Sequence, residues 1–132
     1  MNRRQAREKA IQALFQMDVG AVGAEEALAN VTEGGRSDGF LEQLVKTTAE
    51  HLDRIDETIK KYLINWTFDR LANVDKAILR LAVCELLYFD DIPVKVTLNE
   101  AIELAKTFGD DDSHRFTNGV LAKIAAAEGL AK

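Results

Sequence analysis

Positively charged side chains are concentrated at the start of the chain, where they are suited to bind phosphate groups. The first ten residues contain four basic side chains, Arg3, Arg4, Arg7 and Lys9, and one acidic side chain, Glu8. The other 122 residues carry 13 basic and 21 acidic side chains, so the formal net charge of the whole chain is −5. Three or four contacts from Arg or Lys to single-stranded RNA give a log–log salt slope of about −2 to −3. The segment therefore predicts an arginine-rich arm that binds RNA phosphates.

A helix is expected to carry these basic residues. Asn2 is a good N-cap, and Gln5 follows three residues later, which is the spacing of a capping box. At about 100° per residue, Arg3, Arg7 and Leu14 fall within about 40° of one another. The basic residues thus extend the apolar stripe and are expected to project past the edge of the core. Each basic residue in the first turn of a helix lowers helix stability by about 0.3–1 kcal/mol at low salt. This cost favours a functional role for the basic residues. The alternative is that the terminus is basic without binding any ligand.

The remaining reactive residue types form no pattern that is typical of an enzyme. The sequence lacks Gly-rich phosphate-binding motifs, the H-E-x-x-H zinc motif and the G-x-S-x-G nucleophile motif. Its two histidines, His51 and His114, are 63 residues apart. Cys84 is the single cysteine, which excludes an internal disulfide, and its apolar neighbours predict a buried side chain. Glu100 and Glu103 lack the histidine of a carboxylate-bridged metal site, so we predict no catalytic residue, no cofactor and no metal.

The elements that position these residues are all expected to be helices. Apolar side chains recur at helical spacing, and no pair of strands can be recognised. The segment 73–89 is apolar around most of its circumference, which predicts a central, buried helix. Residues 65–68 are expected to form a corner that plugs the core, and residues 33–39 a loop. The expected helices span residues 2–18, 24–31, 40–63 and 73–89, and the third of them has a break at Asp53 as an alternative. A Thr97-x-x-Glu100 capping box opens the next expected helix, which Gly109 closes. Residues 110–113 open the last helix, and Gly129 ends it.

Length and composition indicate an ordinary globular protein. A chain of 132 residues with 47% apolar and 30% charged residues predicts one domain over 1–132 and excludes disorder. The sequence has no apolar run of about 18 residues and no signal-peptide pattern, so we expect no membrane span and a cytoplasmic location. The expected fold class is all-α, a compact bundle of about six or seven helices.

Four blocks of the sequence carry a resemblance to a known family. The blocks are RRQARE at 3–8, NVDKAILR at 73–80, NEAIELAKTFG at 99–109 and SHRFTNGVL at 113–121. Together they closely resemble the NusB family of bacterial transcription antitermination factors, over nearly the whole chain except residues 20–39. The resemblance implies two small helical subdomains that bind the boxA element of ribosomal RNA transcripts as a heterodimer with NusE, a ribosomal protein of the small subunit. It also implies assembly with NusA and NusG on RNA polymerase, and no small-molecule substrate.

The resemblance assigns roles to individual residues. Asp112 and Phe116 match positions near RNA, and Phe15 and Asp75 match positions on the surface that faces NusE. Gln5 stands where the richest basic runs of the family have another arginine, which implies a weaker grip on RNA. The candidate RNA-binding residues are therefore Arg3, Arg4, Arg7, Lys9, Asp112 and Phe116.

Two other functions are weighed against this one. The chain is a helical adaptor that binds only proteins if the basic segment is incidental. It is a domain related to ribosomal RNA cytosine methyltransferases if a catalytic domain accompanies it, and the length argues against that. Phe116 has a structural alternative, because it shares a helix face with Val120 and Ile124. The acidic body around a small basic arm predicts local RNA binding that depends on a protein partner.

Overall fold

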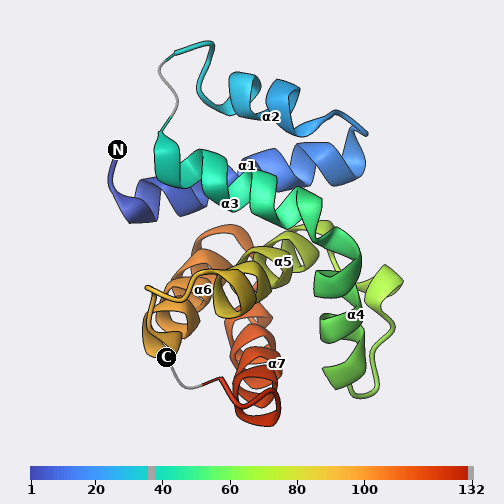
Figure 1. Ribbon diagram of the computed structural model, residues 1–132. Helices are drawn as coiled ribbons and strands as arrows, with labels where there is room; N and C mark the ends of the chain where they lie inside the picture. The colour runs from blue at the N-terminus through green and yellow to red at the C-terminus, as the bar shows by residue number, and fades with distance from the viewer. Residues whose placement is uncertain (36–37, 131–132) are drawn as a thin grey trace.

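Every regular element within residues 1–35 and 38–130, the part of the chain that the structure describes, is a helix. The elements are α1 (Arg3–Val19), α2 (Ala24–Val31), α3 (Gly39–Glu50), α4 (Leu52–Tyr62), the 3-10 helix η1 (Phe68–Arg70), α5 (Asn73–Tyr88), α6 (Val94–Phe108) and α7 (Ser113–Ala127). This computed structural model confirms the predicted all-α fold. Helices α1, α2 and α3 form one layer, and α4 to α7 form the other (Figure 1), as the two expected subdomains require.

Helix α1 begins as the sequence predicts. The Asn2 side chain accepts a hydrogen bond from the Gln5 backbone N–H at 2.8 Å, and the Gln5 side chain accepts one from the Asn2 backbone N–H at 2.9 Å. This reciprocal capping box satisfies two backbone donors that a helix start leaves free. The helix ends at Val19, and the backbone N–H of its C-cap residue Gly20 donates to the Gln16 carbonyl at 2.8 Å. The face of α1 that packs into the core consists of Ala6, Ala10, Ile11, Ala13 and Leu14.

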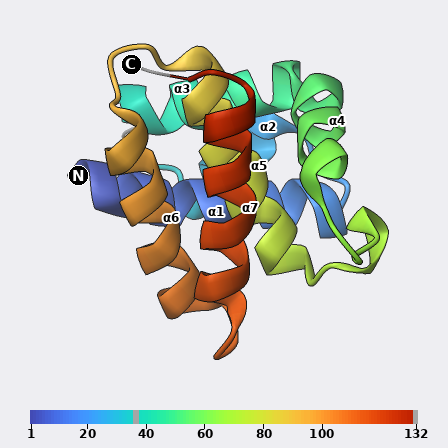
Figure 2. The same ribbon diagram turned by 90° about the horizontal axis from the view of Figure 1, so that it is seen from below.

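Helix α5 is the central element of the fold. It packs against α1 and α3 of one layer and against α4, α6 and α7 of the other, and Figure 2 shows it behind the α6–α7 pair. Its apolar residues are buried around most of the helix, and Cys84 is fully enclosed. Both predictions for this segment are therefore confirmed. Buried apolar residues from every helix contribute to one cluster.

The predicted capping box at the start of α6 is wrong. The helix begins at Val94, three residues earlier, directly after Pro93. Pro93 is the N-cap of α6: its carbonyl accepts a hydrogen bond from the Thr97 backbone N–H at 3.3 Å, and its ring prevents the helix from starting earlier in the chain. Thr97 instead lies within the helix, where its hydroxyl donates to Glu85 Oε1 at 3.0 Å. Glu100 binds Arg4 rather than the backbone.

The turn between α6 and α7 is held by Asp110. Its Oδ1 accepts hydrogen bonds from the backbone N–H groups of Asp112 and Ser113 at 3.0 and 3.1 Å. Gly109 ends α6 as predicted, and a Cβ at this position would lie 2.4 Å from the Ser113 Cβ. The close approach of the α7 start to the α6 end therefore requires glycine.

Two loop predictions need correction. Phe68 plugs the core, but its neighbour Trp66 does not, because 59% of Trp66 is exposed. Helices α3 and α4 are separated at His51 rather than at Asp53. The expected loop at 33–39 includes residues 36 and 37, which lie outside the described residues. No helix among the described residues is both long and apolar enough to cross a membrane.

Candidate nucleic-acid interface

Arg3 and Arg4 present exposed guanidinium groups at the start of α1. Their side chains are 55% and 58% exposed, and each faces an acidic residue. Arg4 forms a two-pronged pair with Glu100, at 3.1 Å from Nε and 3.0 Å from Nη2. Hydrogen bonding to Glu100, followed by its charge, raises the pKa of the Arg4 guanidinium. Arg3 lies 3.8 Å from Asp91 and covers the ring of Phe40 at 4.4 Å.

Arg7 does not project past the core as expected. Its guanidinium is buried and donates to both carboxylate oxygens of Glu85, at 2.8 and 2.9 Å. The side chains of this pair are 3% and 2% exposed. Thr97 donates to the same carboxylate, and the ring of Phe40 lies 5.3 Å from the guanidinium. Arg7 thus joins α1 to α5 and α6, and a phosphate cannot reach it in this structure.

Lys9 is separate from the other basic residues. It lies about 240° around the helix from Arg3, and its side chain is half-buried. The predicted arm is therefore divided into three parts: an exposed pair at the helix start, a buried arginine and a lysine on another side. Of the four predicted basic contacts, Arg3 and Arg4 have the exposure that phosphate binding requires.

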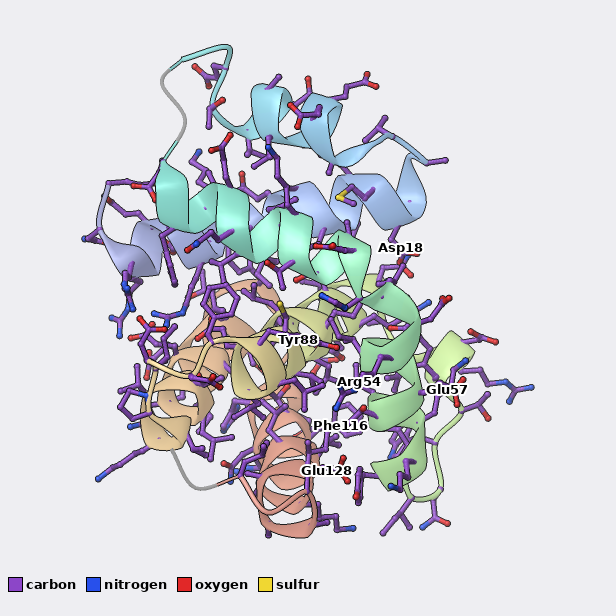
Figure 3. The ribbon with its side chains drawn as sticks, viewed as in Figure 1. Asp18, Arg54, Glu57, Tyr88, Phe116 and Glu128 are labelled. Atoms are coloured by element: carbon purple, nitrogen blue, oxygen red, sulfur yellow. The ribbon has the colours of Figure 1, made fainter. Side chains whose placement is uncertain are left out.

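Three of the other predicted residues meet around one cavity. Asp75 from the first turn of α5 and Asp112 and Phe116 from the start of α7 line a cavity of about 290 Å³. Trp66 lines the same cavity, and its ring lies 5.7 Å from that of Phe116 at an interplanar angle of 63°. Phe116 is half-buried and lies on the side of α7 that faces α4 (Figure 3). Phe116 packs against the core, as its structural alternative predicts, and it also lines an open cavity; its role near RNA stays a prediction.

The acidic residues at this cavity differ in their surroundings. Asp112 is exposed, whereas Asp75 is partly buried, and within the described residues its Oδ1 has no hydrogen-bond partner. Burial raises the pKa of the Asp75 carboxyl, the nearby Ser113 hydroxyl opposes this shift, and the charge of Asp110 adds to it. A carboxylate in this setting favours a partner that donates a hydrogen bond or carries positive charge.

Phe15, the other residue expected to face NusE, is 39% exposed on α1. It comes from the opposite layer to Asp75, although their helices α1 and α5 pack together. The two sets of predicted RNA-binding residues, the arginines at the start of α1 and Asp112 with Phe116 at the start of α7, are also apart. In Figure 2 the start of α1 lies beside α6, and the segment between α4 and α5 lies beyond α7. An RNA strand that contacts both groups has to cross the α6–α7 pair.

Sequence reasoning missed the acidic partners of the arginines and the exposure of Trp66. One signal for Glu85 was present, because a carboxylate in the most apolar helix of the chain requires a buried partner. Asp91, Glu100 and Trp66 gave no such signal. Among the described residues, no group of three or more His, Cys, Asp or Glu side chains is arranged to hold a metal ion.

Comparison with known proteins identifies the family. The profile of the NusB family matches residues 4–126. A relative from Bacillus licheniformis, named transcription antitermination protein NusB, is 57% identical over 124 residues, which are 94% of this chain and 96% of its own. A relative of the same name from Geobacillus kaustophilus is 58% identical over 127 residues, 96% of this chain and 98% of its own.

Solved structures agree with this assignment. T. maritima NusB superposes with a TM-score of 0.86 at 37% identity, covering 96% of this chain and 92% of that one. A chain in the crystal structure of the antitermination factors NusB and NusE in complex with double-stranded RNA has a TM-score of 0.85 at 30% identity, covering 95% of this chain and 96% of that one. The chain therefore belongs to the NusB family.

Proposed function

We propose that this chain is a transcription antitermination factor that binds boxA RNA of ribosomal RNA transcripts as a heterodimer with NusE. The observation that carries the proposal is the exposed pair Arg3 and Arg4. The fold on which they lie is similar to that of a chain in the crystal structure of NusB and NusE in complex with double-stranded RNA. In this proposal Arg3 and Arg4 contact RNA phosphates, whereas the half-buried Lys9, on another side of α1, and the buried Arg7 do not. Asp112 and Phe116 lie near RNA, and the heterodimer acts with NusA and NusG on RNA polymerase.

The acidic partners of the arginines support a dependence of RNA binding on a second protein. Arg4 must leave Glu100, and Arg3 must leave Asp91, before either guanidinium can form a full set of contacts with a phosphate. Each exchange replaces a charge-assisted contact to a carboxylate with one to a phosphate, so the net gain in RNA-binding free energy is small. The negative net charge of the chain also opposes RNA. NusE bound at Phe15 and Asp75 would supply the additional RNA contacts.

A filter-binding titration of boxA RNA and of a scrambled RNA tests the proposal, with and without NusE. We expect the heterodimer to prefer boxA RNA and to lose affinity when Arg3 and Arg4 are both changed to Ala. A matched control changes Lys60 and Lys61 to Ala. These two residues are exposed on α4, so the substitutions remove the same amount of positive charge at a distance from the start of α1. Equal binding of both RNAs, with no loss in the arginine variant, would indicate a protein-only adaptor and contradict the proposal.

A further inference from the structure

The ring of Phe40 lies under the guanidinium group of Arg3. Phe40 belongs to the first turn of α3, and Figure 1 shows the start of this helix beside the start of α1. The Arg3 Cζ atom lies 4.4 Å from the centre of the Phe40 ring, a distance at which a cation is attracted to an aromatic face. The same ring packs against the buried Phe89, with ring centres 6.0 Å apart and an interplanar angle of 88°. Phe40 is therefore held by the core and offers a ring face to Arg3.

The two exposed arginines at the start of α1 are held in different ways. Arg4 uses two of its N–H donors on the carboxylate of Glu100. Arg3 is held against Phe40 instead, and its distance of 3.8 Å from Asp91 is too long for a hydrogen bond. A phenylalanine ring has no oxygen or nitrogen acceptor, so the contact with Phe40 leaves the N–H donors of Arg3 available to a phosphate.

The contact with Phe40 also restricts the Arg3 side chain before RNA arrives. Immobilising a long side chain when a complex forms has an entropic cost, and arginine is among the side chains with the most rotamer freedom to lose. A side chain that is already held in place avoids part of that cost. Because 55% of the Arg3 side chain remains exposed, the ring holds the guanidinium without covering it.

We propose that Phe40 is a positioning residue for RNA binding, which holds the Arg3 guanidinium in place and makes Arg3 the stronger phosphate contact of the exposed pair. The inference rests on the proposed RNA-binding function and adds a residue of α3, outside the basic segment. Arg4 has to break two hydrogen bonds to Glu100 before it binds a phosphate, whereas Arg3 gives up only the longer contact with Asp91. Arg3→Ala is therefore expected to weaken RNA binding more than Arg4→Ala.

A double-mutant cycle between Phe40 and Arg3 tests the inference on the heterodimer with NusE and boxA RNA. We expect Phe40→Leu, which keeps an apolar side chain against Phe89, to weaken RNA binding about 2- to 10-fold. Phe40→Tyr keeps the aromatic ring and is expected to retain most of the affinity. In the Arg3→Ala background, Phe40→Leu is expected to have no further effect, because the group that it positions is gone.

Tyr88→Leu is the matched control for this cycle. Tyr88 is half-buried and packs against the same core, and its ring also faces an arginine, Arg54 of α4, at 5.7 Å. The substitution therefore removes an aromatic ring and a cation contact without touching Arg3. We expect it to leave RNA affinity unchanged, with urea unfolding used to verify that every variant is folded under the binding conditions.

Side-chain NMR of the free protein measures the positioning of Arg3 without RNA. The Nε–H signal of Arg3 is assigned as the one that is lost in Arg3→Ala, and its 15N relaxation reports how ordered the guanidinium is. We expect this order to fall in Phe40→Leu and to be kept in Phe40→Tyr. Unchanged order in Phe40→Leu would overturn the inference, whatever the RNA affinities are.

The binding results separate the inference from the proposed function. If neither Arg3→Ala nor Arg4→Ala weakens RNA binding, both fail. If Arg4→Ala weakens binding as much as Arg3→Ala or more, the inference fails and the proposed function stands. The same holds if Phe40→Leu has no effect, if its effect persists in the Arg3→Ala background, or if Phe40→Tyr or Tyr88→Leu causes an equal loss.

Discussion

Arg7→Met is expected to destabilise the fold strongly without altering the way the protein binds RNA. The substitution leaves the Glu85 carboxylate buried without its two charge-assisted hydrogen bonds, at a site where both side chains are almost fully enclosed. Breaking a buried ion pair by removing one partner costs about 3–5 kcal/mol. The total free energy of unfolding of a domain is about 5–15 kcal/mol, so the change removes a large part of it. With an m-value of about 2 kcal/mol/M, the urea midpoint falls by about 2 M.

Urea unfolding followed by circular dichroism measures this effect. Arg4→Met is the matched control, because the same substitution at the exposed Arg4–Glu100 pair is expected to leave the midpoint nearly unchanged. The double variant Arg7→Met with Glu85→Gln is expected to recover part of the loss. It removes the uncompensated charge, and the Gln side chain keeps an oxygen that accepts from Thr97.

Two results would refute this reasoning. A midpoint change for Arg7→Met as small as that for Arg4→Met would show that the buried pair contributes little. A selective loss of RNA affinity in Arg7→Met, measured at a urea concentration and temperature where the variant is fully folded, would show that Arg7 contacts RNA after all.

Three further predictions concern acidic residues. Glu100→Gln frees its arginine partner and is expected to tighten RNA binding about twofold to fivefold in a filter-binding titration, whereas Glu103→Gln, the same charge change on the same helix, has less effect. Asp112→Asn removes a repulsion worth about 1 kcal/mol at 4 Å in water and is expected to tighten RNA binding up to about fivefold; an effect no larger than that of Asp111→Asn would argue against RNA at this position. Burial raises the folded-state pKa of Asp75 above its unfolded value, so its protonation stabilises the fold as pH falls through the raised pKa, and this contribution is lost at higher pH. Asp75→Asn is therefore expected to raise the free energy of unfolding at pH 7 and to flatten its pH dependence toward pH 4, which urea titrations at both pH values would show.

Helices with local signals were predictable from the sequence. The capping box at Asn2 and the bounds of α2 and α5 depend on neighbouring residues and on apolar spacing, and the structure confirms them. The start of α6 was mispredicted because two local signals compete there. The proline at position 93 determines the helix start, and Thr97 is drawn to a buried carboxylate from another helix.

The surroundings of the basic residues could not be read from local sequence. Arg3, Arg4 and Arg7 have the same residue type within five positions, yet one is buried and two are exposed. The difference arises because Glu85, 78 residues after Arg7 in the chain, reaches its guanidinium in the folded protein. A helical wheel places Arg7 on the side of α1 that faces the core, but it cannot show whether another helix supplies an acidic partner on that side.

The salt dependence of RNA binding tests the central claim most directly. The logarithm of the association constant for boxA RNA is measured against the logarithm of salt concentration for the heterodimer with NusE. If Arg3 and Arg4 contact phosphates of a single strand, changing both to Ala makes the slope shallower by about 1.4, while Arg7→Met leaves the slope unchanged. An unchanged slope in the Arg3 and Arg4 double variant, or a loss of slope in Arg7→Met, would contradict the account.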